Sequence, residues 1–152
     1  MAEAIALSLA NVEKGTGGPF GAVVVKNGQV IARGANRVTA TNDPTAHAEV
    51  VAIREACAKL CVYQLNGCEI YTSCEPCPMC LAAIYWARPD RVFYANTKED
   101  AAGIGFDDSI IYEQLARPLH ERSIPLILMP EMHAAAQAAF KAWEQSEKKI
   151  EY

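Results

Sequence analysis

Two short segments of the chain carry side chains that bind metals and transfer protons. The first contains His47 and Glu49, and the second contains Cys77 and Cys80. Cysteines three residues apart lie on the same face of a helix and can hold one ion between them. Two thiolates and one neutral imidazole fill three of the four positions of a tetrahedral zinc ion, and the fourth can hold water. We therefore predict a zinc site with one open position, as catalytic zinc sites have.

Glu49 follows His47 by two residues and points in a different direction on a helical turn. It is placed to accept a proton from water on the metal and to return it to a substrate. Two other interpretations stay open. Cys74 also fits the spacing, and with it the cluster would be a closed structural zinc site of three cysteines and one histidine. A redox pair of Cys77 and Cys80 would leave the segment with Glu49 unexplained.

The pattern of apolar residues, glycines and prolines predicts the elements that position this cluster. Helices are expected at residues 2–14, 45–60, 77–87, 109–115 and 132–148. Strands are expected at residues 20–26, 29–34, 69–73, 91–95 and 124–129. Asn27-Gly28 predicts a type I′ turn between the first two strands, because this turn needs positive φ at both central residues. Asp43 is expected to cap the second helix, with Pro44 in its first turn.

The order of these elements is a helix and a hairpin, followed by alternating strands and helices. It predicts an α/β fold, a three-layer α/β/α domain with a mixed five-stranded sheet. His47 and Glu49 would then lie at the start of one helix, and Cys77 and Cys80 where a strand passes into the next helix. At about 150 residues per domain, residues 1–152 are expected to form one domain.

Composition narrows the classes of function. Hydrophobic residues make up 51% of the chain and charged residues 21%, which excludes a disordered chain. No apolar run approaches the roughly 18 residues of a membrane span, and the first 14 residues lack the basic start of a signal peptide. The net charge of −4 argues against a nucleic-acid partner. Six cysteines without an export signal indicate metal or thiol chemistry in a cytoplasmic protein.

At the metal-binding segments the sequence resembles the cytidine-deaminase-like zinc deaminases, whose signature is His-x-Glu followed by Pro-Cys-x-x-Cys. Longer strings are similar to those of the short bacterial guanine deaminases, at residues 18–22, 41–50, 71–80, 83–88, 105–109 and 151–152. The resemblance spans nearly the whole chain, and the stretch after Gly105 separates guanine deaminases from other branches. It implies a cytidine-deaminase-like fold and zinc-dependent hydrolysis of guanine, a small purine substrate, to xanthine and ammonia in purine catabolism.

The resemblance also implies roles for single residues. The zinc ligands would be His47, Cys77 and Cys80, and Glu49 would transfer protons. Asn36 would hydrogen-bond the purine, Asp108 would act on it as a binding and catalytic carboxylate, and the chain end at Tyr152 would contact it. The resemblance further implies a homodimer in which the C-terminal segment is exchanged between subunits.

The chemistry of four side chains, Asn36, Asp108, Phe20 and Trp86, agrees with contacts to a flat purine. An amide such as Asn36 both donates and accepts hydrogen bonds, whereas a carboxylate such as Asp108 only accepts them. Phe20 and Trp86 are flat and apolar, so one of them can stack on the purine face, and ordinary core packing is the alternative for both.

Two other functions are compatible with the zinc cluster. A deaminase of another nucleobase, cytosine or the adenosine of a tRNA, would share the signature, but tRNA binding needs a basic surface. Here the lysines of the tail are balanced by glutamates. The other function is that of a zinc-stabilised binding module without activity.

Overall fold

The computed structural model describes residues 1–152 and divides the chain into two units, residues 1–110 and residues 111–152. The first unit contains the sheet and the helices packed on it. Helix α6 (Ser109–Ala116) begins at the end of this unit, and the second unit continues with η1 (Leu119–Glu121), η2 (Pro130–Met132) and α7 (His133–Gln145). None of the helices combines the length and the apolar character that a membrane crossing requires. The single domain expected for residues 1–152 stays a prediction.

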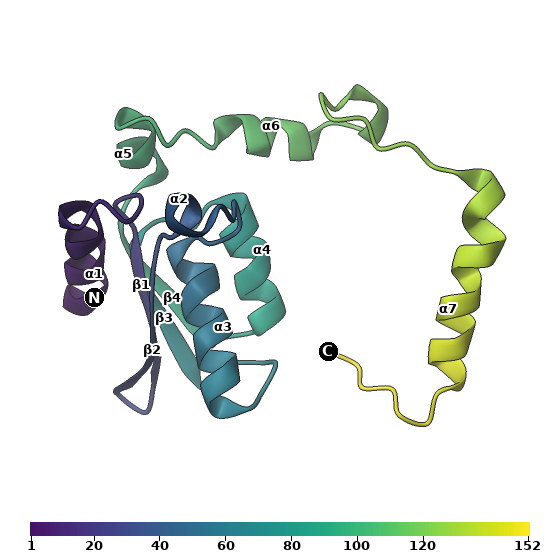
Figure 1. The fold of residues 1–152 in the computed structure, drawn as a ribbon, viewed down its shortest axis with the longest axis horizontal. Helices are drawn as coiled ribbons and strands as arrows, with labels where there is room; N and C mark the ends of the chain where they lie inside the picture. Colours follow the sequence, from purple (N-terminus) through teal and green to yellow (C-terminus); the bar gives the residue numbers. More distant parts are fainter. The chain divides into compact units, whose positions relative to one another are not determined.

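Four strands form one mixed sheet in the order β2-β1-β3-β4 (Figure 1). They are β1 (Gly21–Lys26), β2 (Gln29–Ala35), β3 (Cys68–Cys74) and β4 (Arg91–Asn96). β1 pairs antiparallel with β2 and with β3, whereas β3 and β4 are parallel. The crossover between the parallel strands contains helix α4 (Pro78–Ala87). The α/β class and the mixed sheet with an antiparallel hairpin at one edge are therefore confirmed.

The connection between β1 and β2 is the two-residue turn predicted from Asn27-Gly28. Both residues have positive φ, 52° for Asn27 and 75° for Gly28, as a type I′ turn requires. Ile31 is an extra residue in β2, since Val24 pairs with Ala32 and Val25 with Val30. Such a bulge bends the strand and increases its twist.

The prediction of a fifth strand at residues 124–129 is wrong, because the sheet has four strands. This segment lies in the second unit, and its side chains are exposed. An apolar run becomes a strand only where a neighbouring strand exchanges backbone hydrogen bonds with it. None of the four strands pairs with residues 124–129.

Helices lie on both faces of the sheet (Figure 1). Gly21 of β1 packs against α1 (Ala2–Glu13), and a Cβ added to it would lie 2.3 Å from the Ala4 carbonyl oxygen. Gly34 of β2 packs against α3 (Ala48–Leu60), and a Cβ added there would lie 2.1 Å from the Ala48 carbonyl oxygen. Gly34 pairs with Ala22, the neighbour of Gly21. Because neighbouring residues of a strand face opposite sides, the two glycines lie on opposite faces of the sheet.

The main core lies between the sheet and helices α3 and α4. Its buried residues come from three strands, both helices and one loop, and small side chains predominate. They are Ala22, Val24, Ala32, Ala48, Ala52, Ala56, Leu65, Cys68, Ile70, Ile84 and Ala87. Small side chains let α3 approach the sheet closely, so the position of its first turn is fixed by packing.

Helices α3 and α4 begin slightly later than predicted, at Ala48 and Pro78, and their N-caps are His47 and Cys77. Asp43 does not cap α3, so this prediction is wrong. Its Oδ1 accepts hydrogen bonds from the Thr45 backbone N–H and hydroxyl instead, which closes a turn before the helix. Two short helices were not predicted, α2 (Val38–Thr41) and α5 (Lys98–Gly103).

Candidate active site

Three side chains converge where helices α3 and α4 begin. The metal-binding atoms of His47, Cys77 and Cys80 all lie within 4.8 Å of one another. His47 Nδ1 is 3.6 Å from Cys77 Sγ and 3.5 Å from Cys80 Sγ. A tetrahedral zinc ion with bonds of about 2.3 Å to sulfur and about 2.0 Å to nitrogen holds these atoms about 3.5 Å apart. The cluster therefore fits zinc in both the kind and the spacing of its ligand atoms.

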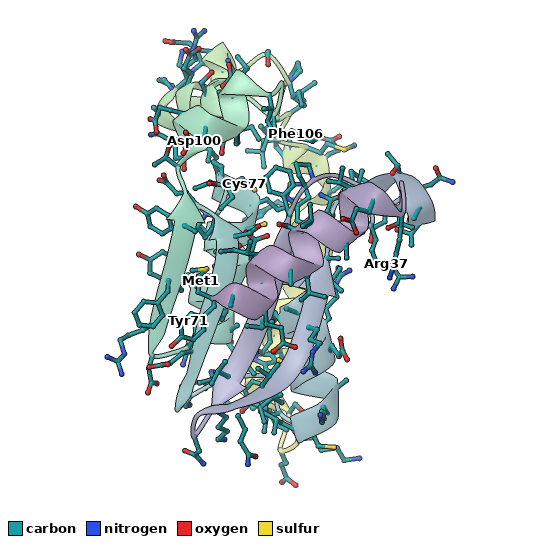
Figure 2. All side chains as sticks on the ribbon, turned by 90° about the vertical axis from the view of Figure 1, so that its left-hand side faces the viewer. Met1, Arg37, Tyr71, Cys77, Asp100 and Phe106 are labelled. Atoms are coloured by element: carbon teal, nitrogen blue, oxygen red, sulfur yellow. The ribbon has the colours of Figure 1, made fainter.

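The backbone explains why the ligands meet at this point. His47 (φ −69°, ψ 155°) and Cys77 (φ −62°, ψ 167°) are extended residues directly before a helix. Pro78 favours a helix start after Cys77, since proline needs no N–H at the first helical position. The positive ends of two helix dipoles thus face one site, and they favour a thiolate or a carboxylate there. Figure 2 shows Cys77 near the end of the sheet where Asp100 and Phe106 also lie.

Hydrogen bonds within the cluster divide the charge unevenly between the two thiols. The interaction between the two sulfurs, together with His47, lowers the pKa of Cys77 to about 4 although burial opposes the change. The same interaction and burial raise the pKa of Cys80 above its usual range. The bond to Cys77 raises the pKa of His47, against the effect of burial. The negative charge of the cluster thus lies mainly on Cys77.

Glu49 lies beside the cluster and is only 5% exposed. Its Oε1 accepts a hydrogen bond of 2.9 Å from the Thr72 hydroxyl, and its Oε2 accepts one of 3.4 Å from the Cys80 thiol. Burial raises the pKa of the Glu49 carboxyl, and the hydrogen bond from Thr72 opposes this change. A carboxyl with a raised pKa can both accept and donate a proton nearer neutral pH.

Cys74 does not belong to the group of side chains that can share the ion. Its thiol donates a hydrogen bond of 3.4 Å to the Thr97 carbonyl oxygen, and burial raises its pKa to about 11. A neutral thiol bonded elsewhere is a poor zinc ligand, because thiolates bind metals. The geometry therefore favours three protein ligands over the closed site of four.

Asn36 is buried at 5% exposure, between the loop after α1 and helix α2. Its Oδ1 accepts hydrogen bonds of 3.3 Å from the backbone N–H groups of Gly18 and Val38. These bonds fix the orientation of the amide, because its oxygen is held on the protein side. The Nδ2 group is then the part of Asn36 that can donate to a bound molecule.

Asp108 and Phe20 belong to the same unit as the cluster. Asp108 is half-buried, and its pKa is raised by burial and by the negative charge of Cys77. Phe20 meets Phe106 edge to face, with ring centroids 4.9 Å apart. This contact attaches the segment that leads to Asp108 to the start of β1.

Of the remaining predicted site residues, Trp86 lies away from the cluster and Tyr152 belongs to the other unit. Trp86 lies six residues after Cys80, about two turns further along α4, and is 63% exposed. Tyr152 is an exposed residue at the end of the second unit. Their contacts with a substrate stay predictions.

Two residues that hydrogen-bond to predicted site residues were missed from the sequence, Thr72 beside Glu49 and Asn11 beside Asn36. Thr72 alternates along β3 with the buried residues Ile70 and Cys68, so it lies on the same face of the strand. A threonine on this apolar face was the feature of the sequence that could have indicated its role. Asn11 is a polar residue among the apolar positions of α1, and nothing local marks it as important.

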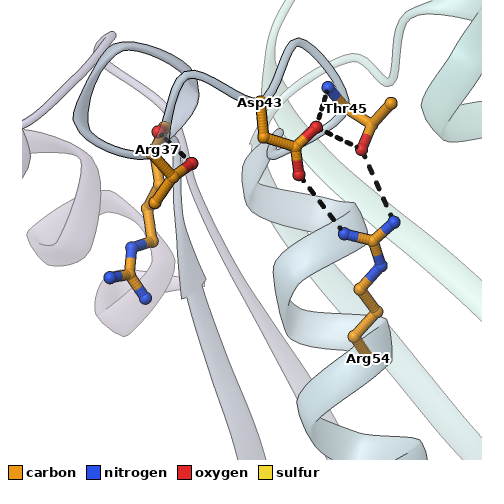
Figure 3. A network of polar contacts seen from close by, with 5 residues as sticks. Arg37, Asp43, Thr45 and Arg54 are labelled. Carbon is orange, nitrogen blue, oxygen red and sulfur yellow. Dashed lines mark hydrogen bonds and ion pairs between the residues drawn. The ribbon is translucent and has the colours of Figure 1, made fainter.

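A polar network holds the turn before His47 against α3 (Figure 3). Arg54 of α3 contacts Asp43 at 3.6 Å, and its guanidinium donates a hydrogen bond of 3.5 Å to the Thr45 hydroxyl. The two hydrogen bonds from Thr45 lower the pKa of Asp43. These contacts restrict the approach of the chain to the His47 cap.

Residues 1–96 match the family model of the cytidine and deoxycytidylate deaminase zinc-binding region. The match covers the sheet, helices α1 to α4 and the complete cluster. The chain therefore belongs to this zinc-binding deaminase family, and zinc is its cofactor.

The chain is similar to a guanine deaminase over nearly its whole length. It is 55% identical to the guanine deaminase of Bacillus subtilis over 98% of this chain and 94% of that protein. The X-ray structure of guanine deaminase from Bacillus subtilis superposes with a TM-score of 0.93, covering 99% of this chain and 95% of that one at 54% identity.

Two other relatives match a smaller part of the chain. The tRNA-specific adenosine deaminase of Aquifex aeolicus is 42% identical over 57% of this chain and 57% of that protein. A solved structure in complex with 2,6-diaminopurine has a TM-score of 0.68 and 38% identity, covering 70% of this chain and 60% of that one. That neighbour therefore binds a small purine analogue.

Proposed function

We propose that this chain is a zinc-dependent guanine deaminase, which hydrolyses guanine to xanthine and ammonia. The observation that carries this proposal is the extent of the similarity. It continues past residue 96, where the family model ends, and reaches 98% of the chain in the Bacillus subtilis guanine deaminase. The Aquifex aeolicus adenosine deaminase matches only 57% of the chain.

The reaction needs an activated water and a route for its protons. Water adds to C2 of guanine, the amino group leaves as ammonia, and the product carries a carbonyl at that carbon. Zinc held by His47, Cys77 and Cys80 supplies a Lewis acid that lowers the pKa of water toward neutrality. The positive helix start at Cys77 favours its thiolate form, and the thiolates of Cys77 and Cys80 would provide the negative charge that retains the ion.

Glu49 transfers the protons in this proposal. It accepts a proton from the attacking water and delivers it to the ring nitrogen, and it then accepts the proton of the hydroxyl added at C2 and delivers it to the departing amine. The Thr72 hydroxyl keeps the carboxylate oriented, and burial raises its pKa so that the protonated form is accessible between the two transfers.

The purine would be held by side chains around the cluster. Asn36 offers its Nδ2 group to an acceptor on the base, and Asp108 accepts from an N–H group and assists catalysis. Phe20 would stack on the ring, with Trp86 as the other candidate. Tyr152 would complete the contacts from the chain end.

We also propose a homodimer in which the C-terminal segment is exchanged between subunits. The second unit buries none of its residues, and Phe140 and Trp143 of α7 are exposed at 66% and 46%. A helix with uncovered aromatic side chains is typical of a segment that packs against another subunit. Light scattering of the chain with and without residues 147–152 tests this assembly, and a monomer in both cases contradicts it.

Ammonia release from guanine, adenine, cytosine and a tRNA anticodon stem tests the substrate. We expect turnover of guanine, in keeping with a cytoplasmic enzyme of purine catabolism that binds no nucleic acid. Turnover of another base with guanine inert would assign a different deaminase. No turnover of any base by zinc-loaded protein would favour a binding module.

A further inference from the structure

Asn11, in the last turn of α1, connects two loops that lie far apart in the sequence. Its Nδ2 donates hydrogen bonds to the Gly18 carbonyl at 2.8 Å and to the Asn36 carbonyl at 2.9 Å. Its Oδ1 accepts a hydrogen bond of 2.7 Å from the Thr16 hydroxyl. Asn11 is 6% exposed, so both ends of its amide have defined partners in a buried position.

The same two loops are also joined by Asn36 itself, whose Oδ1 accepts from the Gly18 N–H. Asn11 and Asn36 thus hold Gly18 from opposite sides, one at its carbonyl and the other at its N–H. Gly17 lies directly over this junction, because a Cβ added there would be 2.2 Å from the Asn36 carbonyl oxygen and 3.0 Å from Asn11 Nδ2. The junction therefore has no room for a side chain at position 17.

We propose that Asn11 is a positioning residue for base binding, acting through Asn36. Loss of its two donors would remove the Asn11 bond to the Asn36 carbonyl and leave the Gly18 carbonyl with the Phe20 N–H, at 2.8 Å, as its partner. It would also loosen the Gly18 N–H that orients the Asn36 amide. The Nδ2 group would then no longer be held toward the substrate. This inference rests on the proposed role of Asn36 in binding the purine.

Steady-state kinetics of Asn11→Ala and Asn11→Asp, compared with Asn36→Ala, test the proposal. We expect KM for guanine to rise about tenfold in each Asn11 variant, the effect of about one net hydrogen bond, with little change in kcat. Binding of 8-azaguanine, measured by calorimetry, should weaken by a similar factor. Thr16→Val keeps Asn11 but removes the hydrogen bond that the Thr16 hydroxyl donates to Asn11 Oδ1, and it should cause a smaller rise in KM. This variant tests the proposal if the Asn11 variants do not fold.

Two comparisons distinguish positioning from a role in stability alone. In the double variant Asn11→Ala/Asn36→Ala, KM should stay within about twofold of that of Asn36→Ala, because both changes remove one interaction. Ser8→Ala removes a local hydrogen bond on the same helix, from its hydroxyl to the Ile5 carbonyl, and should leave KM unchanged.

The possible results separate this inference from the proposed function. Unchanged KM and unchanged 8-azaguanine affinity in folded Asn11 variants, or an additive double variant, overturn the role of Asn11 while guanine turnover stands. A wild-type chain that deaminates another base contradicts the proposed substrate, and KM for that base then decides the role of Asn11. A wild-type chain that neither binds nor turns over a base overturns both.

Discussion

Replacing Glu49 with glutamine separates proton transfer from folding and metal binding. The two side chains have nearly the same size, so the buried site keeps its packing. The glutamine oxygen can still accept from the Thr72 hydroxyl, which lies 2.9 Å from Glu49 Oε1. Its NH2 group then faces Cys80 Sγ, 3.4 Å from the present Oε2, and can donate to that sulfur when Cys80 binds zinc as a thiolate. We therefore expect unfolding free energy to change by less than about 1 kcal/mol.

The loss of activity should be much larger. An amide neither accepts nor delivers a proton, and general acid–base catalysis contributes about 10²- to 10⁴-fold to a rate. We expect kcat for guanine to fall by this factor in Glu49→Gln, equivalent to about 2.7–5.5 kcal/mol. Ammonia release measures kcat, elemental analysis measures the zinc content, and thermal unfolding measures stability.

Thr72→Val tests the same proton transfer with a smaller expected loss of activity. The change removes the one hydroxyl that donates to Glu49 and keeps the shape of the side chain. A hydrogen bond to a charged group is worth about 1.5–3 kcal/mol, which limits the loss of activity to about 10- to 150-fold. Because the lost bond stabilises the carboxylate, the pKa of Glu49 should rise further and the acid limb of kcat/KM should move to higher pH. Glu49→Gln that keeps a tenth or more of wild-type kcat would refute the reasoning, as would Thr72→Val with an unshifted acid limb.

Three further predictions concern the cluster and its support. Cys74→Ala should keep one zinc ion per chain, because the Cys74 thiol bonds to Thr97 and not to the ion. A loss of zinc in this variant, measured by elemental analysis, would instead support the closed site with Cys74 as the fourth ligand. Gly34→Ala should destabilise the fold by about 1–3 kcal/mol in denaturant unfolding and loosen zinc binding, since the new Cβ would lie 2.1 Å from the Ala48 carbonyl oxygen. An unchanged unfolding midpoint would show that α3 does not need this approach. Removal of zinc by a chelator should abolish guanine turnover and lower the thermal midpoint, both restored by zinc, and activity that survives complete removal would contradict the metal mechanism.

The sequence was sufficient for the parts of the site that depend on local spacing. Cys77 and Cys80 are one helical turn apart, so any helix starting near them brings both sulfurs to one face. The turn at Asn27-Gly28 is equally local, since its two residues carry the required positive φ themselves. Neither prediction required knowledge of the tertiary contacts.

The predictions that failed depend on distant partners. Residues 124–129 have the apolar character of a strand, but no strand of the sheet pairs with them. Asp43 has the chemistry of a helix cap, but its carboxylate bonds to Thr45 in a turn two residues before the His47 cap. Thr72 and Asn11 matter because they meet Glu49 and Asn36 across the fold, which single-chain patterns do not reveal.

The placement of two ligands at helix caps has a consequence for the mechanics of the fold. An ion shared by His47 and Cys77 ties together two backbone segments 30 positions apart, as a disulfide would, but reversibly. Such a tie restricts the fraying of both first turns at once. Amide hydrogen exchange at the beginnings of α3 and α4 should therefore become faster together when the ion is removed. The metal site would then stabilise the fold as well as take part in the reaction.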